Sequence, residues 1–242
     1  MNGIRALRAA FSYFTILPFG TAEPPDAVAL AWLPLVGAVV GAIAGTAAYL
    51  VAYVAPPAVA VAVAFGLSIV LSGAIHLDGF LDGCDAFFAS VSPERRLEIL
   101  KDPRHGTFAL AGFAVIAVFW LAALWSLDPL TYPLALALTG AASRWSAVIH
   151  ALWFAYGRAG TPPRALERKP PFAVLAIGAV LVALLAFALR APGCAAAFVA
   201  LIVAAGAITW ARVRLGGGVV GDAYGFTIVI AEVAALVTLA AL

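Results

Sequence analysis

The sequence contains very little charge. Only 11% of its 242 residues are Asp, Glu, Lys or Arg, whereas a soluble globular domain usually carries about 25%. No charged residue lies between Ala27 and Ile75, and apolar runs of about 20 residues, enough to cross a bilayer core of roughly 30 Å, recur along the chain. This scarcity excludes a soluble domain and predicts a polytopic membrane protein.

Cysteine and net charge are also scarce. The two cysteines, Cys84 and Cys194, lie in different segments and form no C-x-x-C pair, which argues against a disulfide framework or a zinc site. The formal net charge is only +2, so we expect no nucleic-acid partner. No small-residue cleavage site follows an apolar stretch within Met1 to Pro18, so we expect no cleavable signal peptide.

Hydropathy predicts an all-α fold, with a single transmembrane domain over residues 1–242 that forms a polytopic helical bundle of about seven spans. The predicted spans are 27–54, 57–76, 107–127, 130–153, 171–189, 194–211 and 219–242. Breakers such as Pro56-Pro57 and Pro192-Gly193 separate neighbouring spans. No internal repeat or linker indicates a second domain.

The positions of the basic residues predict the orientation. Cytoplasmic loops of membrane proteins carry an excess of Lys and Arg. With the N-terminus inside, the inner segments hold all but two of the 14 basic residues, namely Arg5, Arg8, Arg95, Arg96, Lys101, Arg104, Arg158, Arg164, Arg168, Lys169, Arg212 and Arg214. Only Arg190 falls in an outer loop, and Arg144 lies within a span. The distribution predicts an N-in/C-out topology.

Two short segments are expected on the membrane surface. Residues 11–20, FSYFTILPFG, are too short to cross and read as an interfacial anchor, although their end near Pro18 is also placed to line the cytoplasmic mouth. In the cytoplasmic segment 77–106, Ser92 is a suitable N-cap and Pro93 a suitable first helical residue. We therefore predict a short interfacial helix in this segment.

Three carboxylates follow the second apolar run. Asp78, Asp82 and Asp85 have i, i+4, i+7 spacing and would share one face of a helix, with His76 joining them if the helix begins there. Carboxylates one turn apart repel by roughly 3 kcal/mol at about 6 Å and an effective dielectric near 20. Mg²⁺ prefers such hard oxygen ligands. The apolar flanks favour a metal or diphosphate site over a solvated acidic face.

Glycines accompany the acids in two places. Gly79 and Gly83 form a stripe beside them, where another backbone or a phosphate could approach closely. The stretch LGGGVVGDAYGF opens the last span and contains Gly221 and Asp222. Free backbone N–H groups and the positive end of a helix would be available there for an anion. Ordinary N-terminal capping by Asp222 is the alternative.

Basic groups are predicted to face the same side. Lys101, Asp102 and Arg104 lie in a turn before the third span, where Arg and Lys suit phosphate contact; enrichment of positive charge inside is the alternative explanation. Arg144 is expected to bind a substrate phosphate or an Asp, or else to extend to the interface. For Glu232, function and a hidden salt bridge stay equal alternatives.

Five stretches together resemble one family. HLDGFLDGCD at 76–85, KDPRHGTF at 101–108 and GGGVVGDAYG at 216–225 resemble cobalamin synthase, the adenosylcobinamide-GDP ribazoletransferase family. FSYFTILP at 11–18 and WLPLVG at 32–37 resemble its N-terminal element and the start of its first span. The order of the motifs and the hydropathy also match, so the resemblance covers nearly the whole chain.

The resemblance implies a Mg²⁺-dependent transfer of phosphocobinamide from adenosylcobinamide-GDP to alpha-ribazole or its 5′-phosphate, with release of GMP. It implies that Asp78, Asp82, Asp85 and Asp222 are the metal ligands and that His76, Asp82 and Asp222 are the catalytic residues. The implied substrate-binding residues are Lys101, Asp102, Arg104, Arg144 and Gly221.

The resemblance further implies a bacterial or archaeal cell (inner) membrane. The N-in/C-out topology brings the candidate residues to the cytoplasmic side and so predicts a single polar site there, formed by His76, Asp78, Asp82, Asp85, Asp102, Arg104, Arg144 and Asp222. The bilayer is an expected partner, and a homo-oligomer is left open. Two other functions were weighed. A polytopic prenyltransferase binds Mg-diphosphate but needs a second multi-Asp cluster, and a cation-coupled transporter would place acids at mid-membrane, where only Glu232 lies.

Overall fold

The computed structural model describes residues 3–20, 24–150, 153–157 and 167–242. Its helices are α1 (Gly3–Phe14), α2 (Ala27–Ala31), α3 (Leu33–Val51), α4 (Pro57–Leu71), α5 (Ile75–Phe88), α6 (Pro93–Ile99), α7 (Thr107–Trp125), η1 (Pro129–Thr131), α8 (Tyr132–His150), α9 (Phe172–Ala188), α10 (Arg190–Arg214) and α11 (Gly221–Ala241). The β structure among these residues is one isolated bridge, between Tyr156 and Val219. The all-α prediction is confirmed.

Every predicted span contains a helix. By length and hydropathy, α3, α7, α10 and α11 could each cross a membrane, and α4 with α5 forms a bent pair that could be a broken span or a re-entrant loop. Helix α9 is apolar but shorter. The count of seven and the N-in/C-out orientation stay predictions. Residues 151–152 of the fourth predicted span, and the basic residues Arg158 and Arg164, lie outside the described residues.

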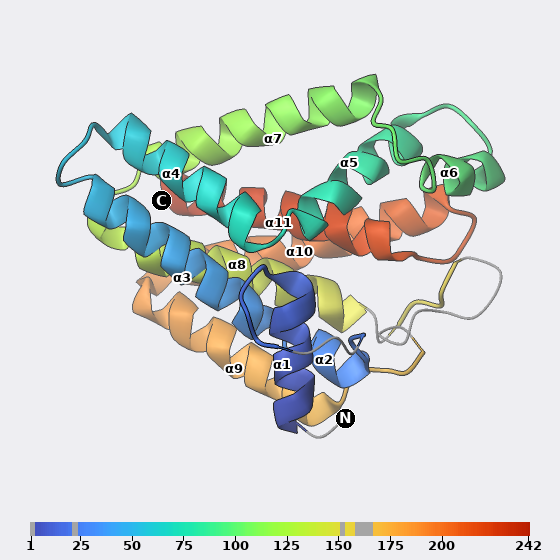
Figure 1. Ribbon diagram of the computed structural model, residues 1–242, viewed down its shortest axis with the longest axis horizontal. Coiled ribbons are helices and arrows are strands. Elements are labelled where there is room, and N and C mark those ends of the chain that lie inside the picture. The colour runs from blue at the N-terminus through green and yellow to red at the C-terminus, as the bar shows by residue number, and fades with distance from the viewer. Residues whose placement is uncertain (1–2, 21–23, 151–152, 158–166) are drawn as a thin grey trace.

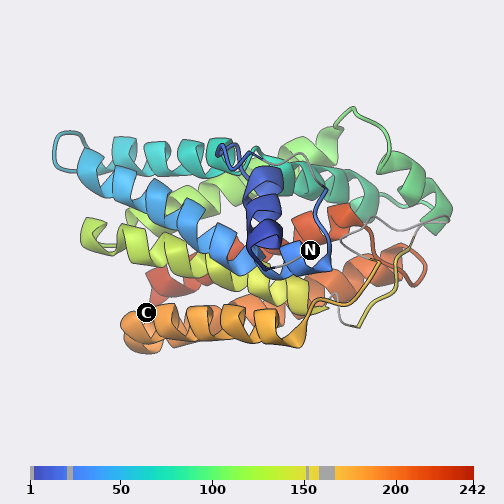
Figure 2. The same ribbon diagram turned by 60° about the horizontal axis from the view of Figure 1, so that its bottom comes forward.

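The elements that carry the candidate site lie at one end of the bundle. Figure 1 shows α5, α6 and the start of α11 at the end opposite the C-terminus, and Figure 2 shows the same arrangement from another side. Helix α1 lies across the bundle, as an interfacial element would. Its C-terminal extension reaches α4, where the Ile16 backbone N–H donates to the Leu71 carbonyl at 3.0 Å.

The second predicted span ends earlier than expected. Helix α4 stops at Leu71, and Gly73 and Ala74 follow with φ angles of 59° and 57°. This left-handed backbone favours glycine and turns the chain so that α5 runs at 90° to α4. The bend places α5, with its acids, as a separate helix against α11.

Close glycine packing joins α3 to α8. A Cβ atom added at Gly37 would overlap the Gly140 backbone, and one added at Gly41 would overlap the Leu136 backbone. Such small residues at i, i+4 spacing allow helix backbones to approach closely inside a membrane. Helix α8 is consequently buried along most of its length and forms the centre of the bundle.

Two arginines secure the far end of α5. Arg96 of α6 donates to the Ala89 carbonyl at 2.6 Å, and Arg214 of α10 donates to the carbonyls of Phe87 and Ala89, each at 2.7 Å. Arginine near a helix C-terminus satisfies carbonyls that have no partner within the helix. Helix α6 also begins as predicted, because the Ser92 hydroxyl accepts from the Arg95 backbone N–H at 3.4 Å.

The α3–α8 contact predicts a position-specific response to a single methyl group. Gly41→Ala places its Cβ against rigid backbone of α8, so it should lower the free energy of unfolding by about 1–3 kcal/mol, the usual cost of overpacking. Gly66→Ala is the matched control, because an added Cβ there meets open space. Thermal unfolding of the detergent-solubilised protein measures both, and equal midpoints would contradict the close contact.

Candidate active site

Asp78 and Asp82 of α5 face the turn that precedes α7. His105 lies between them, with Nδ1 3.4 Å from Asp82 Oδ1 and Nε2 3.9 Å from Asp78 Oδ1. The Asp82 side chain is only 17% exposed, whereas that of Asp78 is 68% exposed. The structure therefore brings the 101–106 turn to the acids, as the sequence analysis expected.

A third acid reaches this cluster from α11. Asp222 lies in the first turn of α11, which packs directly against α5. A Cβ atom added at Gly79 would lie 3.2 Å from the Cα atoms of both Asp222 and Gly225. The predicted approach along the Gly79 stripe is thus made by the α11 backbone, and it brings Asp222 toward Asp82.

The crowding of carboxylates changes the titration of Asp82, which lies beyond the predicted second span. Burial, together with the charges of Asp78, Asp222 and Asp85, raises the pKa of Asp82 to about 6, and His105 opposes the shift only in part. Removing a carboxylate from water and placing like charges nearby both disfavour its ionised form. A bound cation would reverse this electrostatic penalty.

Asp85 faces α7 more than the other acids. Its Oδ2 accepts from the Gly106 backbone N–H at 2.5 Å and its Oδ1 from the Ala109 backbone N–H at 3.0 Å. These are N–H groups of the first turn of α7, which have no partner within the helix. Asp85 therefore caps α7, a structural role that the sequence analysis did not expect, and its predicted role as a metal ligand stays a prediction.

The carboxylate oxygens of the acids are hard ligands of the kind that Mg²⁺ prefers. Among the described residues, no three His, Cys, Asp or Glu side chains form a group that could hold a metal ion. Mg²⁺ keeps several waters and is commonly bound by one or two carboxylates plus substrate phosphates. Asp78, Asp82 and Asp222 offer that chemistry.

The basic turn contains an ion pair that the sequence analysis did not specify. Arg104 donates from Nε and Nη2 to the two carboxylate oxygens of Asp102, at 2.8 Å and 2.7 Å. These hydrogen bonds lower the pKa of Asp102 to about 2. Asp85, Asp102, Arg104 and Gly106 line a polar pocket of about 410 Å³ beside the acids. Lys101, which directly precedes the lining residue Asp102, is exposed.

The predicted single polar site is divided in two. His76 and Arg144 line a separate inner cavity of about 70 Å³ together with Glu232, and Asp78, Asp82 and Asp222 do not line it. Arg144 forms an ion pair with Glu232, so its acidic partner is a Glu of α11 and not one of the predicted Asp residues. His76 is buried, and its ring stacks on Phe14 at 5.8 Å.

The glycine-rich turn before α11 has the predicted conformational freedom. Gly216 and Gly217 have φ angles of 80° and 119°, and Arg212 donates from Nε to the Gly217 carbonyl at 2.8 Å. Gly221 begins α11, and an added Cβ there would meet open space. The start of α11 is therefore accessible beside Asp222.

Comparison with known proteins decides the family. The family model described as cobalamin-5-phosphate synthase matches residues 6–240. The chain belongs to the cobalamin-5-phosphate synthase family. It is 37% identical to an adenosylcobinamide-GDP ribazoletransferase of Deinococcus radiodurans, over 96% of this chain and 84% of the relative. It is 31% identical to one of Desulfitobacterium hafniense, over 96% of this chain and 95% of the relative. No solved structure matches.

This membership makes the chain an enzyme and confirms the resemblance seen in its motifs. Sequence reasoning missed the contact of His105 with the acids and the identity of the partner of Arg144, although a hidden salt bridge was one of the two alternatives for Glu232. The first has a local signal, since His105 belongs to the KDPRHG turn that was expected at the site. Arg144 and its partner Glu232 lie 88 positions apart. The sequence feature that could have indicated their pairing is that each is a charged residue within an apolar span.

The inner ion pair predicts opposite outcomes for single and double substitutions. Glu232→Gln leaves the largely buried Arg144 charge without its partner, which should cost about 3–5 kcal/mol of stability. The double variant Arg144→Met with Glu232→Leu removes both charges and should be nearly neutral or stabilising. Unfolding midpoints in detergent measure both, and a double variant less stable than Glu232→Gln would contradict a compensated buried pair.

Proposed function

We propose that this member of the synthase family transfers the phosphocobinamide group of adenosylcobinamide-GDP to a hydroxyl of alpha-ribazole or its 5′-phosphate. The observation that carries the proposal is the acid cluster of Asp78, Asp82 and Asp222 beside the basic 101–106 turn. Phosphoryl transfer depends mainly on positioning and charge neutralisation, and this arrangement offers groups for both. The leaving group would be GMP.

Mg²⁺ is the proposed cofactor, held by Asp78, Asp82 and Asp222, with Asp85 as a further ligand through lone pairs not used in capping α7. When bound, it would neutralise the charge of the diphosphate. The crowding of these carboxylates around Asp82, which is largely buried, supports this proposal, because their mutual repulsion favours a divalent cation. Asp222 is also a candidate base.

Lys101 and Arg104 are proposed to bind phosphate oxygens. The Arg104 side chain is 84% exposed, and its Nε and Nη2 groups donate to the Asp102 carboxylate. A substrate phosphate would compete with Asp102 for this fork or bind its remaining N–H groups. The backbone N–H of Gly221 is a further donor, at the positive end of α11.

Removal of the acceptor hydroxyl proton requires a base. His76 is the candidate expected from the sequence, but it faces the inner cavity with Arg144 and Glu232. His105 is the imidazole that lies beside Asp78 and Asp82. We therefore propose that His105 orients the acceptor hydroxyl or accepts its proton beside the acids. The roles expected for His76 as a base and for Arg144 as a phosphate-binding group would have to be exercised from the inner cavity.

The proposed location is the cell (inner) membrane of a bacterium or archaeon, with the acids facing the cytoplasm and the helices in the bilayer. The two other functions have less support. The described residues contain no second multi-Asp cluster for a prenyltransferase, and Glu232, the acid expected of a transporter, is paired with Arg144.

The test is GMP release from adenosylcobinamide-GDP and alpha-ribazole by the purified protein in proteoliposomes, titrated with Mg²⁺. Asp82→Asn should lose activity by on the order of a hundredfold or more, because the developing phosphoryl charge would lose its counter-ion. It should fold normally, because it relieves repulsion among the acids. Glu94→Gln is the matched control, since Glu94 is an exposed acid in the first turn of α6 that does not line the polar pocket.

Wild-type protein that releases no GMP with either form of ribazole would overturn the proposed reaction. Wild-type turnover together with an unaffected Asp82→Asn variant would leave the reaction standing and reject the assigned acids.

A further inference from the structure

An apolar groove of about 540 Å³ lies between α5, α7 and α11. Its lining includes Phe80 and Phe88 of α5, Phe108 of α7 and Phe226 of α11. The most polar side chain in the lining is the thiol of Cys84. Neither the metal site nor the phosphate-binding groups proposed above make use of this groove.

The aromatic rings gather at the end of the groove that is nearest the acids. Phe108 is the second residue of α7, and Phe226 lies in the second turn of α11, so both are close to the ends of the helices that border the site. Farther along the same helices, the lining contains one more ring, Phe119, and is otherwise aliphatic, with side chains such as Val115, Val233 and Val237. The groove therefore has an aromatic end and an aliphatic end.

The aromatic end is continuous with the candidate active site. Phe108 lines both the groove and the polar pocket that contains Asp85, Arg104 and Gly106. A molecule that is flat and apolar at one end and polar at the other would fit both spaces at once. Small-molecule sites commonly have this composition, with an apolar wall and a few polar groups.

Two of the four rings at this end are available for stacking, whereas Phe80 and Phe226 are buried. Phe88 and Phe108 are each 51% exposed, and their near-parallel rings have centroids 6.4 Å apart. On α7, Ala111 also lines the groove, whereas Gly112 is the point where α7 packs closely on Cys84 and Phe80. Aromatic faces at such positions favour a planar π-system.

We propose that the aromatic end of this groove binds the planar aromatic base of the acceptor nucleoside, alpha-ribazole or its 5′-phosphate, with the ribose directed toward Asp85 and Gly106. The inference rests on the proposed function and adds where its acceptor is recognised. A lipid acyl chain is the competing occupant. It would gain nothing specific from four phenylalanine rings and would be expected along the aliphatic end, near Val115 and Val237.

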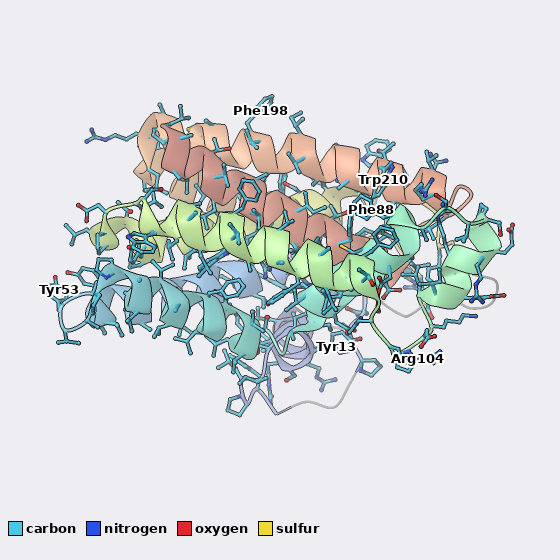
Figure 3. All side chains as sticks on the ribbon, turned by 90° about the horizontal axis from the view of Figure 1, so that it is seen from above. Tyr13, Tyr53, Phe88, Arg104, Phe198 and Trp210 are labelled. Carbon is cyan, nitrogen blue, oxygen red and sulfur yellow. The ribbon has the colours of Figure 1, made fainter. Side chains whose placement is uncertain are left out.

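The first test replaces one ring. Phe108→Ala should raise the KM for alpha-ribazole by about 5- to 150-fold, the usual effect of losing a base-stacking ring, with little change in the KM for adenosylcobinamide-GDP. Phe198→Ala is the matched control, because Phe198 is an exposed ring on the outer face of α10, away from Phe88 and Arg104 (Figure 3). It should leave both KM values unchanged.

The second test fills the groove. Ala111→Trp puts a large ring among the groove-lining residues, whereas Ala114→Trp places the same ring at an exposed position of α7 that does not line it. Ala111→Trp should raise the KM for alpha-ribazole, and Ala114→Trp should leave it unchanged. The ribazole KM of the wild type should also fall by about fourfold for each apolar methyl group added to the base.

The outcomes separate this inference from the proposed function. Wild-type GMP release that depends on alpha-ribazole, with unchanged ribazole KM in Phe108→Ala and Ala111→Trp, would overturn the groove assignment alone. Loss of co-purified phospholipid in these variants, again with unchanged KM, would identify a lipid site instead. Absence of any ribazole-dependent release by the wild type would reject the proposed function itself.

Discussion

Repulsion among carboxylates is the constraint on which the candidate site depends. Asp78 and Asp82 lie on α5, Asp222 approaches from α11, and burial with these like charges raises the pKa of Asp82 to about 6. Like charges that are brought together and partly removed from water disfavour one another's ionised forms. The arrangement is explained if a divalent cation and an anionic substrate complete it, which is the electrostatic requirement of phosphoryl transfer.

The rest of the fold holds these charges in place. Gly79 and Gly225 let α5 and α11 approach closely enough to bring Asp222 beside α5. Asp85 connects α5 to the start of α7, and Arg214 connects the C-terminal end of α5 to α10. These contacts hold the C-terminal end of α5, and the packing of Gly79 against α11 holds its middle, so the acids lie on a helix that is fixed along its length.

Local patterns in the sequence predicted much of this arrangement. The spacing of the acids placed them on one helix, Ser92 and Pro93 marked the start of α6, and the glycine stripe indicated close contact at Gly79. Contacts between distant residues were not predictable in the same way. The Asp85–Gly106 bond spans 21 positions and the Arg144–Glu232 pair spans 88, and their formation depends on how helices pair across the bundle, which local spacing does not encode.

Direct measurement of metal binding tests the central claim that the acids form a cation site. Mn²⁺, as a spectroscopic substitute for Mg²⁺, can be titrated into the purified protein with and without GDP and followed by electron paramagnetic resonance. The account predicts that Asp222→Asn weakens Mn²⁺ binding on the order of tenfold or more, because one close carboxylate is lost, whereas neutralising the exposed acid in Glu94→Gln has no effect. Equal Mn²⁺ affinity in wild type and Asp222→Asn, under both conditions, would contradict the account.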